Sequence, residues 1–313
     1  MISVKRYDLS FKPQWDSFVE SAKNGQFLFK RDYMDYHADR FDDHSLCIFR
    51  DDELLALMPA CAKGEQLLSH AGLTFGGILS NTRMRTPYML EVVDAIYDYL
   101  RTQHFTSCVY KAIPHIYHRY PSEEDSYALI RAGAKLMRCD VTSTLCKASQ
   151  LPYSERRTRG IKKAQKSGIV FAPSTHYAAY FDIVGTILEE KYHAQSTHTA
   201  AEMQILAGRF PANIALWTAQ NKSGAILAGV IMYISQQVAH AQYIAATDEG
   251  KECGALDGLF DHMITKCYPD KTYFDFGIST EQAGKVLNTG LVTQKEEFGA
   301  RAIVHQTFLW NFG

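Results

Sequence analysis

Residues 273–301, YFDFGISTEQAGKVLNTGLVTQKEEFGAR, decide the fold class of this chain. The stretch opens as an apolar strand that one carboxylate, Asp275, interrupts, and Ser279 and Glu281 follow where the strand should end. A short amphipathic helix with Lys295 comes next. Carboxylates at a strand end are placed to take a proton from an amine, and burial raises their pKa. The alternative is structural: Asp275 satisfies backbone groups and Glu281 only begins the next helix.

Three parts of the second half have counterparts in the first half. VYKAIP at 109–114 aligns with FDFGIS at 274–279, LIRAGAK at 129–135 with KEEFGAR at 295–301, and LSHA at 68–71 with VAHA at 238–241. The offsets are 165, 166 and 170 residues, so the three matches keep nearly one register. Order and spacing together indicate an internal duplication. We therefore predict an α/β (α+β) fold of two tandem domains, 1–146 and 147–313, each a mixed, mostly antiparallel sheet flanked by helices.

The expected elements follow one order in both halves. In the first half they are helices at 15–22, 32–40, 88–102 and 124–132, and strands at 46–49, 54–62, 66–70, 107–112 and 135–146. In the second half they are helices at 177–192 and 255–267, a short helix ending near Phe298, and strands at 214–219, 226–235, 238–246, 273–277 and 302–310.

Composition limits the classes of function. The net charge of -1 gives the 313-residue chain no overall attraction to polyanions. The longest apolar run, Ala225 to Ile234, is about ten residues and too short to cross a bilayer, and the start lacks the apolar segment of a secretory signal. The seven cysteines are scattered without a Cys-x-x-Cys motif. We therefore predict a cytoplasmic protein without a disulfide framework or a membrane span.

The segment Thr247-Asp-Glu-Gly-Lys-Glu-Cys-Gly-Ala255 is predicted to be a turn-rich loop between a strand and a helix. Gly250 and Gly254 let a ligand approach the backbone, and a helix N-terminus offers free amide groups to a pyrophosphate. On that basis Gly250, Lys251, Gly254 and Ala255 are candidate cofactor-binding residues. An ordinary βα turn is the alternative.

Several polar residues of the second half are candidates for the chemistry. His240, at the duplicated histidine position, can act as a base or a hydrogen-bond donor, or it can be a satisfied core histidine. Tyr243 lies three residues further on, and His193 and His198 flank a polar loop that can bind an acceptor. The histidine spacings are not a zinc signature, so no metal is predicted.

Arginines and lysines form one dense basic run, made up of Arg156, Arg157, Arg159, Lys162, Lys163 and Lys166. As a tRNA footprint the run would contact phosphates without reading bases. The alternative is a solvated helix face, which charge runs usually are.

The stretch 243–301 resembles the C-terminal part of FemAB-type and related GNAT-fold proteins. The resemblance rests on Phe-Asp-Phe-Gly at 274–277, Gly-Leu at 290–291 and Lys-x-x-Phe-Gly at 295–299. Residues 157–169, RTRGIKKAQKSGI, are similar to the motif that opens the second domain in that family. The chain departs from the usual GNAT phosphate-loop pattern, because Leu256 takes its last position, and it has no helical-hairpin arm.

The resemblance implies two tandem GNAT-like domains, with the active site in the second. It implies an N-acyltransferase that moves an acyl group from acyl-CoA to an amine, such as an amino sugar or a cell-envelope precursor. The family's transition-state lysine falls on Lys295, where it would steady an oxyanion or donor phosphates; a solvated helix face is the alternative. Asp275 or Glu281 would remove the amine proton, with His240 assisting, and the substrate-binding candidates are Tyr243, His193, His198, Ser279 and Arg157.

Two further functions are compatible with the sequence. One is a FemX-like aminoacyltransferase that uses aminoacyl-tRNA in peptidoglycan bridge synthesis. The other is a non-catalytic binding module on the same fold, which the imperfect phosphate loop suggests. Binding of acetyl-CoA would distinguish the module from the enzyme.

Overall fold

The computed structural model describes residues 1–192 and 196–312, and the chain divides into two compact units. Unit 1 comprises 1–141, 280–286 and 304–313, and unit 2 comprises 142–279 and 287–303. This division differs from a single boundary after residue 146. Two long strands, β9 (Lys135–Cys146) and β17 (Arg301–Asn311), each contribute residues to both units.

Unit 1 contains the elements of the first repeat. Its helices are α1 (Lys12–Ser21), α2 (Arg31–Met34), α3 (Thr86–Thr102) and α4 (Glu124–Arg131). Its strands are β1 (Ile2–Arg6), β2 (Asp42–Asp43), β3 (Leu46–Arg50), β4 (Glu53–Met58), β5 (Cys61–Lys63), β6 (Gln66–Leu68), β7 (Leu79–Ser80) and β8 (Ser107–Lys111), and β15 (Thr280–Glu281) pairs with β16 (Val286–Leu287). The strand orders are β1-β3-β4-β7 and β17-β8-β6-β5-β2.

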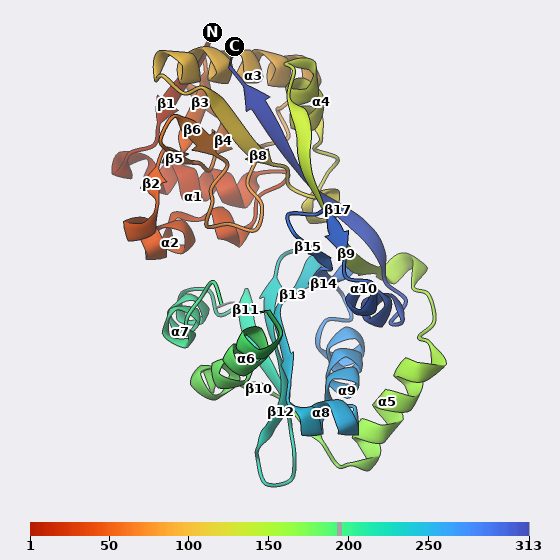
Figure 1. The fold of residues 1–313 in the computed structure, drawn as a ribbon. Helices are drawn as coiled ribbons and strands as arrows, with labels where there is room; N and C mark the ends of the chain where they lie inside the picture. Colours follow the sequence, from red (N-terminus) through yellow and green to blue (C-terminus); the bar gives the residue numbers. More distant parts are fainter. Residues whose placement is uncertain (193–195, 313) are drawn as a thin grey trace. The chain divides into compact units, whose positions relative to one another are not determined.

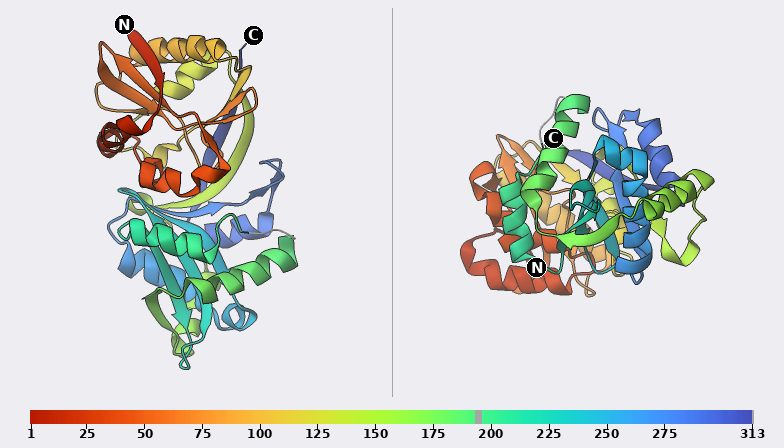
Figure 2. Two further views of the ribbon diagram at one scale, coloured as in Figure 1. Left: turned by 90° about the vertical axis from the view of Figure 1, so that its left-hand side faces the viewer. Right: turned by 90° about the horizontal axis from the view of Figure 1, so that it is seen from below.

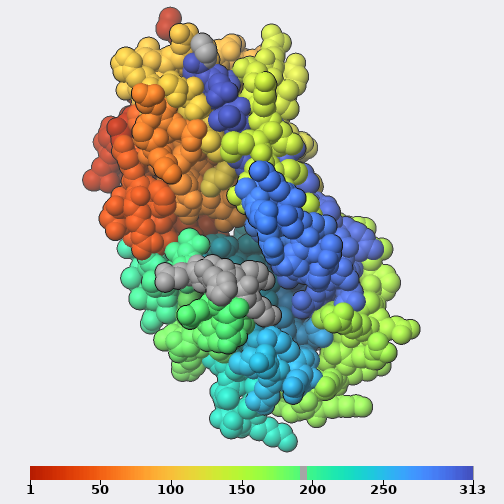
Figure 3. All heavy atoms as spheres, in the orientation of Figure 1, coloured from red at the N-terminus to blue at the C-terminus, as the bar shows by residue number. Residues whose placement is uncertain are grey.

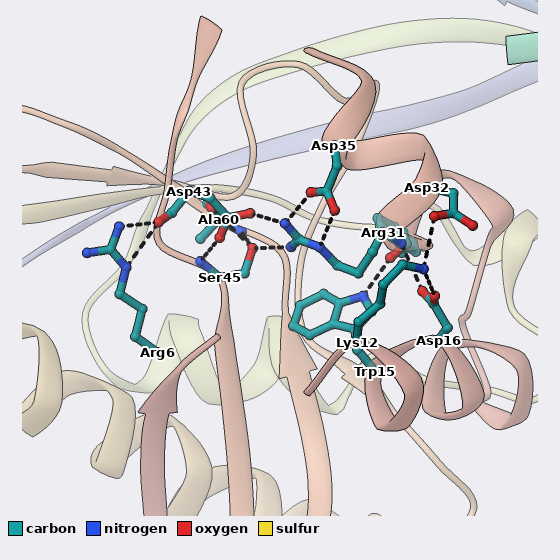
Figure 4. Close-up of polar contacts among 11 residues, drawn as sticks. Arg6, Lys12, Trp15, Asp16, Arg31, Asp32, Asp35, Asp43, Ser45 and Ala60 are labelled. Atoms are coloured by element: carbon teal, nitrogen blue, oxygen red, sulfur yellow. Dashed lines mark hydrogen bonds and ion pairs between the residues drawn. The ribbon is translucent and has the colours of Figure 1, made fainter. Parts of the chain in front are cut away.

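A buried arginine ties the N-terminal elements of unit 1 together (Figure 4). The guanidinium of Arg31 forms ion pairs with Asp35 and with Asp43, the latter at 2.6 Å, and lies 3.9 Å from the centre of the Tyr7 ring. The indole nitrogen of Trp15 donates to the Phe29 carbonyl at 2.7 Å. A buried charge needs such partners, because without them its desolvation is costly. These polar groups are therefore engaged in holding the fold.

Unit 2 contains the elements of the second repeat. Its helices are α5 (Glu155–Lys166), α6 (Tyr177–Tyr192), α7 (Ala200–Arg209), α8 (Asp248–Cys253), α9 (Ala255–His262) and α10 (Thr289–Glu296), with a π-helical turn at Met263–Cys267 after α9. Its strands are β10 (Val170–Ser174), β11 (Ile214–Gln220), β12 (Ile226–Ile234), β13 (Val238–Ala246) and β14 (Tyr273–Ile278). They follow the order β10-β11-β12-β13-β14-β9.

Helices cover both faces of the unit 2 sheet. Helix α9 packs over β11, β12 and β13, whereas α6 contacts β12 and β13 and α7 contacts β11. Figure 1 shows α6 and α7 on one side of these strands and α9 on the other, and in the left view of Figure 2 α6 and α7 lie in front of the sheet. The two-sided cover explains why β12 is apolar along almost its whole length, since both its faces are buried.

The two units share one distinctive strand arrangement. In unit 1, β6 pairs in parallel with β8, and in unit 2, β13 pairs in parallel with β14. The next strand is exchanged between the repeats: β17 pairs with β8 in unit 1, and β9 pairs with β14 in unit 2. Both of these pairs are antiparallel, as are β3–β4, β10–β11, β11–β12 and β12–β13. The predicted mixed, mostly antiparallel sheets flanked by helices are therefore confirmed.

The predicted loop at 247–255 contains a short helix, α8. Thr247 caps it by accepting a hydrogen bond from the Gly250 amide at 3.0 Å, and Asp248 and Glu249 lie in its first turn, where negative charge is favourable. Gly254 ends the helix with a left-handed φ of 75°. No helix in the described part of the chain is both long and apolar enough for a membrane span.

Candidate functional site

The parallel strands β13 and β14 separate in the middle of unit 2. They pair from Val238 and Tyr273 to His240 and Asp275, and beyond that pair β13 continues to Ala246. A register shift in the pairing of β12 with β13 leaves Gln242 as an extra residue between Ala241 and Tyr243. Such bulges are frequent beside active sites because they re-aim side chains. Ligands of sheet proteins bind where neighbouring strands diverge.

Asp275 and His240 form a hydrogen-bonded pair at the point of separation. The Nδ1 atom of His240 lies 2.6 Å from Oδ2 of Asp275, and its Nε2 atom lies 3.2 Å from the side-chain amide oxygen of Gln242. Asp275 is fully buried, and His240 is 9% exposed. The geometry can fix the tautomer and the orientation of the imidazole, as in carboxylate–histidine pairs that transfer protons.

The alternation of β14 explains how a carboxylate lies in this core. Phe274 and Phe276 point to one face of the strand and contact Phe260 of α9, with ring centroids 6.1 and 5.0 Å away. Asp275 points to the opposite face, where Thr142 and Thr144 of β9 both donate hydroxyl hydrogen bonds to its Oδ1 atom. The aromatic contacts thus fix the strand that presents the carboxylate.

Lys295 of α10 lies at the end of β14. Its ammonium group donates to the carbonyl oxygens of Gly277 and Ile278 at 2.7 and 2.8 Å, and the side chain is 5% exposed. Burial lowers the pKa of Lys295 to about 8, while the nearby Asp275 carboxylate opposes that shift. In the structure Lys295 therefore holds the separated end of β14. Asp275, His240 and Lys295, three of the four predicted catalytic residues, belong to this one cluster.

Tyr243 and His198 are also brought together. The Tyr243 hydroxyl lies 2.7 Å from Nδ1 of His198, two residues before α7, and the Tyr243 ring contacts Phe181 of α6 at 5.5 Å between centroids. Burial raises the pKa of Tyr243 above its ordinary value. The pair connects the helices of one face to β13 just after the bulge.

A pocket of about 470 Å³ lies between helices of unit 2. Its lining comes from α5, α8, the start of α9 and α10, and comprises Arg156, Arg157, Arg159, Gly160, Lys163, Gly250, Lys251, Glu252, Gly254, Leu256, Asp257, Gly290 and Gln294. Five cationic side chains against two carboxylates give it a formal excess of three positive charges. Figure 3 shows the yellow-green surface of α5 beside the light-blue surface of α8 and α9. The pocket is suited to an anion with several phosphate groups.

The predicted cofactor-binding residues belong to this pocket, but packing already explains its glycines. A Cβ atom on Gly250 would lie 2.1 Å from the Leu227 carbonyl oxygen, and one on Gly254 would lie 2.4 Å from that of Gly160. Gly254 is the N-cap of α9 and offers no side chain to the amides of the first turn. Lys251 also lines the pocket, whereas Ala255 is fully buried at the start of α9.

Arg157, predicted to bind substrate, is engaged inside the protein. Its guanidinium donates to Asp257 of α9 and, at 2.9 Å, to Glu297 after α10, and the side chain is 4% exposed. It also lies 5.5 Å from the centre of the Phe298 ring. These contacts fasten α5 to α9 and α10, and they leave Arg156, Arg159 and Lys163 as the basic pocket residues of α5.

The remaining predicted residues are dispersed. Glu281 is an exposed residue of β15 in unit 1, so it lies outside the unit 2 cluster. Ser279 is 1% exposed at the end of β14, and His193 is outside the described residues. Sequence reasoning missed Thr142, Thr144 and Gln242. Over the described ranges, no group of three or more His, Cys, Asp or Glu side chains is arranged to hold a metal ion.

Comparison with known proteins identifies the fold class. No family model matches the chain, and no curated sequence matches it. Several solved structures align with nearly the whole chain, and one of these is described as a tandem GNAT protein from the clavulanic acid biosynthesis pathway. That structure has a TM-score of 0.55 and 11% identity, and covers 100% of this chain and 99% of that one. The predicted tandem GNAT-like fold is thereby confirmed.

Two other structures give higher TM-scores. FemX aligns with a TM-score of 0.70 and 10% identity, covering 99% of this chain and 97% of that one. The L-PGS protein from Bacillus licheniformis aligns with a TM-score of 0.63 and 11% identity, covering 97% and 92%. At these identities the likeness is one of fold. The chain thus has the FemX-like tandem GNAT fold that residues 243–301 led us to expect.

Proposed function

We propose that this protein is an N-acyltransferase that transfers an acyl group from acyl-CoA to an amine. The observation that carries the proposal is the cationic pocket of unit 2 together with the buried His240–Asp275 pair where β13 and β14 separate. Helix α10 borders both features, since Gly290 and Gln294 line the pocket and Lys295 holds the end of β14.

The donor is bound through its phosphate groups. Arg156, Arg159, Lys163 and Lys251 supply positive charge, and the uncapped amides at the start of α9 supply hydrogen-bond donors. Phosphates are recognised in this way at helix N-termini of many nucleotide-binding proteins. The anchor fixes the donor in unit 2 and leaves the acyl end to reach the separated strands.

The reaction is a direct attack by the amine on the thioester carbonyl. The C–N bond forms and the C–S bond breaks, while the amine takes the place of the Gln242 amide at Nε2 of His240, its proton passes to that nitrogen, and the thiolate leaves. Asp275 holds the ring through Nδ1 and stabilises the positive charge that the imidazole gains. His240 then gives the proton to the leaving thiolate, so protons balance over the cycle.

The acceptor is an amine, and an amino sugar or another cell-envelope precursor is the first class of compound to assay. Tyr243 lies on β13, just past the bulge at Gln242, and its partner His198 lies two residues before α7. We assign them to orientation of the acceptor, because their polar atoms and ring faces suit a hydroxylated amine.

A second donor class, aminoacyl-tRNA, is favoured by one specific observation. The basic residues of α5 extend beyond the pocket to Lys162 and Lys166, both exposed. A polyanion larger than coenzyme A would use these outer charges as well as the pocket. With this donor the bond that breaks is the ester C–O bond to the ribose, whose oxygen takes the proton.

Charge reversal on α5 tests the proposal and separates the donors. We expect acetyl-CoA to bind the wild-type protein with a micromolar dissociation constant in a calorimetric titration. The double variant R159E/K163E should weaken binding at least tenfold, about 1.4 kcal/mol, because two cations of the pocket lining become anions. The control K166E reverses one charge on the same helix outside the lining and should leave the affinity unchanged.

Turnover is measured as release of free thiol from acetyl-CoA in the presence of a panel of amino sugars. If both R159E/K163E and K166E weaken aminoacyl-tRNA binding, and acetyl-CoA does not bind, the second donor is correct. Failure of both donors to bind the wild-type protein would overturn the enzymatic assignment in favour of a non-catalytic module.

A further inference from the structure

We infer that Thr142 and Thr144 are positioning residues for the His240–Asp275 pair, so that a strand of the first repeat completes the proton-transfer centre of unit 2. Both threonines belong to β9, which begins in unit 1 and ends in unit 2. The inference rests on the proposed function for its catalytic meaning, but its structural core, the orientation of Asp275, can be tested without turnover.

The hydrogen bonds around Asp275 divide between its two oxygens. Both threonine hydroxyls donate to Oδ1, that of Thr144 at 2.9 Å, and the Gly277 amide donates to the same oxygen at 3.4 Å, while Oδ2 faces Nδ1 of His240 at 2.6 Å. A carboxylate with these donors on one oxygen cannot rotate freely about its χ2 bond without losing them. Its other oxygen is therefore held toward the imidazole, and the imidazole is held with Nδ1 toward the carboxylate.

The threonines also bear on the charge of Asp275. The carboxylate is fully buried, and Thr142 and Thr144 are 0% and 5% exposed. An ionised carboxylate in such a place is stable only when hydrogen bonds replace its water. Each hydroxyl that donates to the charged form favours that form. Removal of the two hydroxyls therefore makes the pair take up a proton at higher pH.

The titratable groups that face Asp275 come from two other elements. His240 approaches from β13, and Lys295 approaches from α10, where the carboxylate acts on its charge. From β9 the two threonine hydroxyls are directed to the carboxylate. Because imidazole and carboxylate are in direct contact, we expect a change at Thr142 or Thr144 to appear in the pH dependence of the reaction.

A purely structural role for the threonines is the competing explanation, since β9 and β14 are paired strands. Two features of the chain separate the explanations. A serine keeps the hydroxyl but loses the methyl group, and a valine keeps the shape but loses the hydroxyl. In addition, Ser143 lies between the two threonines, is fully buried and points to the opposite face of the strand, so it provides a matched control.

The experiment compares wild type with T142V/T144V, T142S/T144S and S143A, in full-length protein. For acetyl-CoA and a reactive amine, we expect T142V/T144V to lower kcat about tenfold and to move the acidic limb of the pH profile up by about one pH unit. The KM for acetyl-CoA should not change, because the pocket lies elsewhere in unit 2. T142S/T144S should have the wild-type kcat and the wild-type acidic limb of the pH profile, and S143A should match wild type in both.

An activity-independent measurement keeps this inference separate from the proposed function. The ring nitrogens of His240 are observed by 15N NMR as pH is varied, with H240Q used to assign the signal. The wild-type protein should show Nδ1 protonated and hydrogen-bonded, and T142V/T144V should shift the titration midpoint upward by about one unit while serine restores it. An unchanged midpoint and pH profile in a folded T142V/T144V protein overturns the inference. A wild-type protein that binds and turns over neither donor overturns the proposed function, while the NMR result still decides the role of the threonines.

Discussion

The parallel strand pairs β6–β8 and β13–β14 occupy equivalent places in the two units, but their polar residues differ in kind. By the duplication offsets, His70 corresponds to His240 and Tyr110 to Asp275. In unit 1, the Tyr110 hydroxyl donates to Asp125 and accepts from the Ile78 amide. In unit 2, the equivalent place holds a fully buried carboxylate facing an imidazole.

The two histidines differ as well, since His240 lies within β13 and His70 lies two residues beyond the end of β6. The His70 ring stacks on His37, with centroids 5.7 Å apart and planes inclined by 15°, and burial lowers the pKa of His70 to about 3. It is therefore a neutral core group near neutral pH. The His240 ring faces Asp275 instead. Both units bury a carboxylate near this strand, but Asp125 accepts from the Tyr110 phenol in unit 1, whereas Asp275 faces an imidazole in unit 2. A phenol stays neutral near neutral pH and an imidazole can exchange a proton, so we assign packing to the first pair and propose function for the second.

Replacement of the two histidines should give the largest difference in activity between equivalent variants of the two units. H240Q removes the proposed proton acceptor, and we expect kcat/KM for acyl transfer to fall at least 100-fold, since positioned general bases contribute about that much. H70Q lies in unit 1 and should change kcat by less than about threefold. Circular dichroism first shows that both variants are folded. Steady-state kinetics then compares their kcat and kcat/KM with those of wild type. Equal losses in the two variants would contradict a functional difference between the copies.

Two equivalent glycines differ in the space that surrounds them. Gly133 follows α4 with a φ of 90°, and Gly299 follows α10 with a φ of 85°. A Cβ atom on Gly133 would meet nothing within 4 Å, but one on Gly299 would lie 2.3 Å from the Leu151 carbonyl oxygen. G133A should therefore lose only about 1 kcal/mol of unfolding free energy through backbone strain. G299A should lose roughly 1–3 kcal/mol more of unfolding free energy, because the backbone at Leu151 must move.

Urea unfolding of the two glycine variants measures this difference. Equal losses would mean that the packing of Leu151 against Gly299 does not distinguish the copies in solution.

Acid should destabilise the protein in part through His70, a buried histidine of unit 1. The pKa of His70 is about 3 in the folded chain, against an ordinary value of about 6.5. Between these values the unfolded chain binds a proton that the folded chain does not, so stability falls as pH decreases from about 6.5 toward 3. From pH 7 to pH 5 the loss is about 2 kcal/mol for this residue.

The comparison of wild type with H70Q isolates that contribution. Urea unfolding at pH 7 and pH 5 should show a smaller loss in H70Q by about 2 kcal/mol. The exposed His115 supplies the control, and H115Q should follow wild type. If H70Q loses as much stability as wild type between these pH values, the His70 ring is protonated in the folded chain. His70 would then not be a neutral core group, and its contrast with His240 would not hold.

The sequence allowed the regular elements to be predicted because their apolar patterns are local. Strands β9 and β13 have the predicted bounds, 135–146 and 238–246, since alternation and apolar runs define both ends. Helix α7 was missed, although Thr199 and Glu202 form a capping box that marks its start. Helix α8 was missed because a six-residue helix depends on its Thr247 cap and on Gly254 rather than on a periodic pattern.

The candidate site was predictable only in part. His240, Asp275 and Lys295 could be named because polar residues in or beside apolar strands are visible in one sequence. Their partners could not: Thr142 lies 133 residues from Asp275 in the chain, and the exchange of β9 between the repeats brings them together. Arg157 had the pattern of a solvated basic helix, and only packing against α9 reveals its buried ion pairs.

Hydrogen exchange with bound donor tests the central claim most directly, namely that the second copy alone binds the donor. Exchange is followed by mass spectrometry with and without saturating acetyl-CoA, and separately with aminoacyl-tRNA. We expect bound donor to slow the exchange of amides at 156–163 and 247–258, around the pocket of unit 2, and to cause no change at 66–77 or 86–102 in unit 1. Protection confined to the unit 1 segments, or no protection of 247–258 by either donor, would contradict the claim.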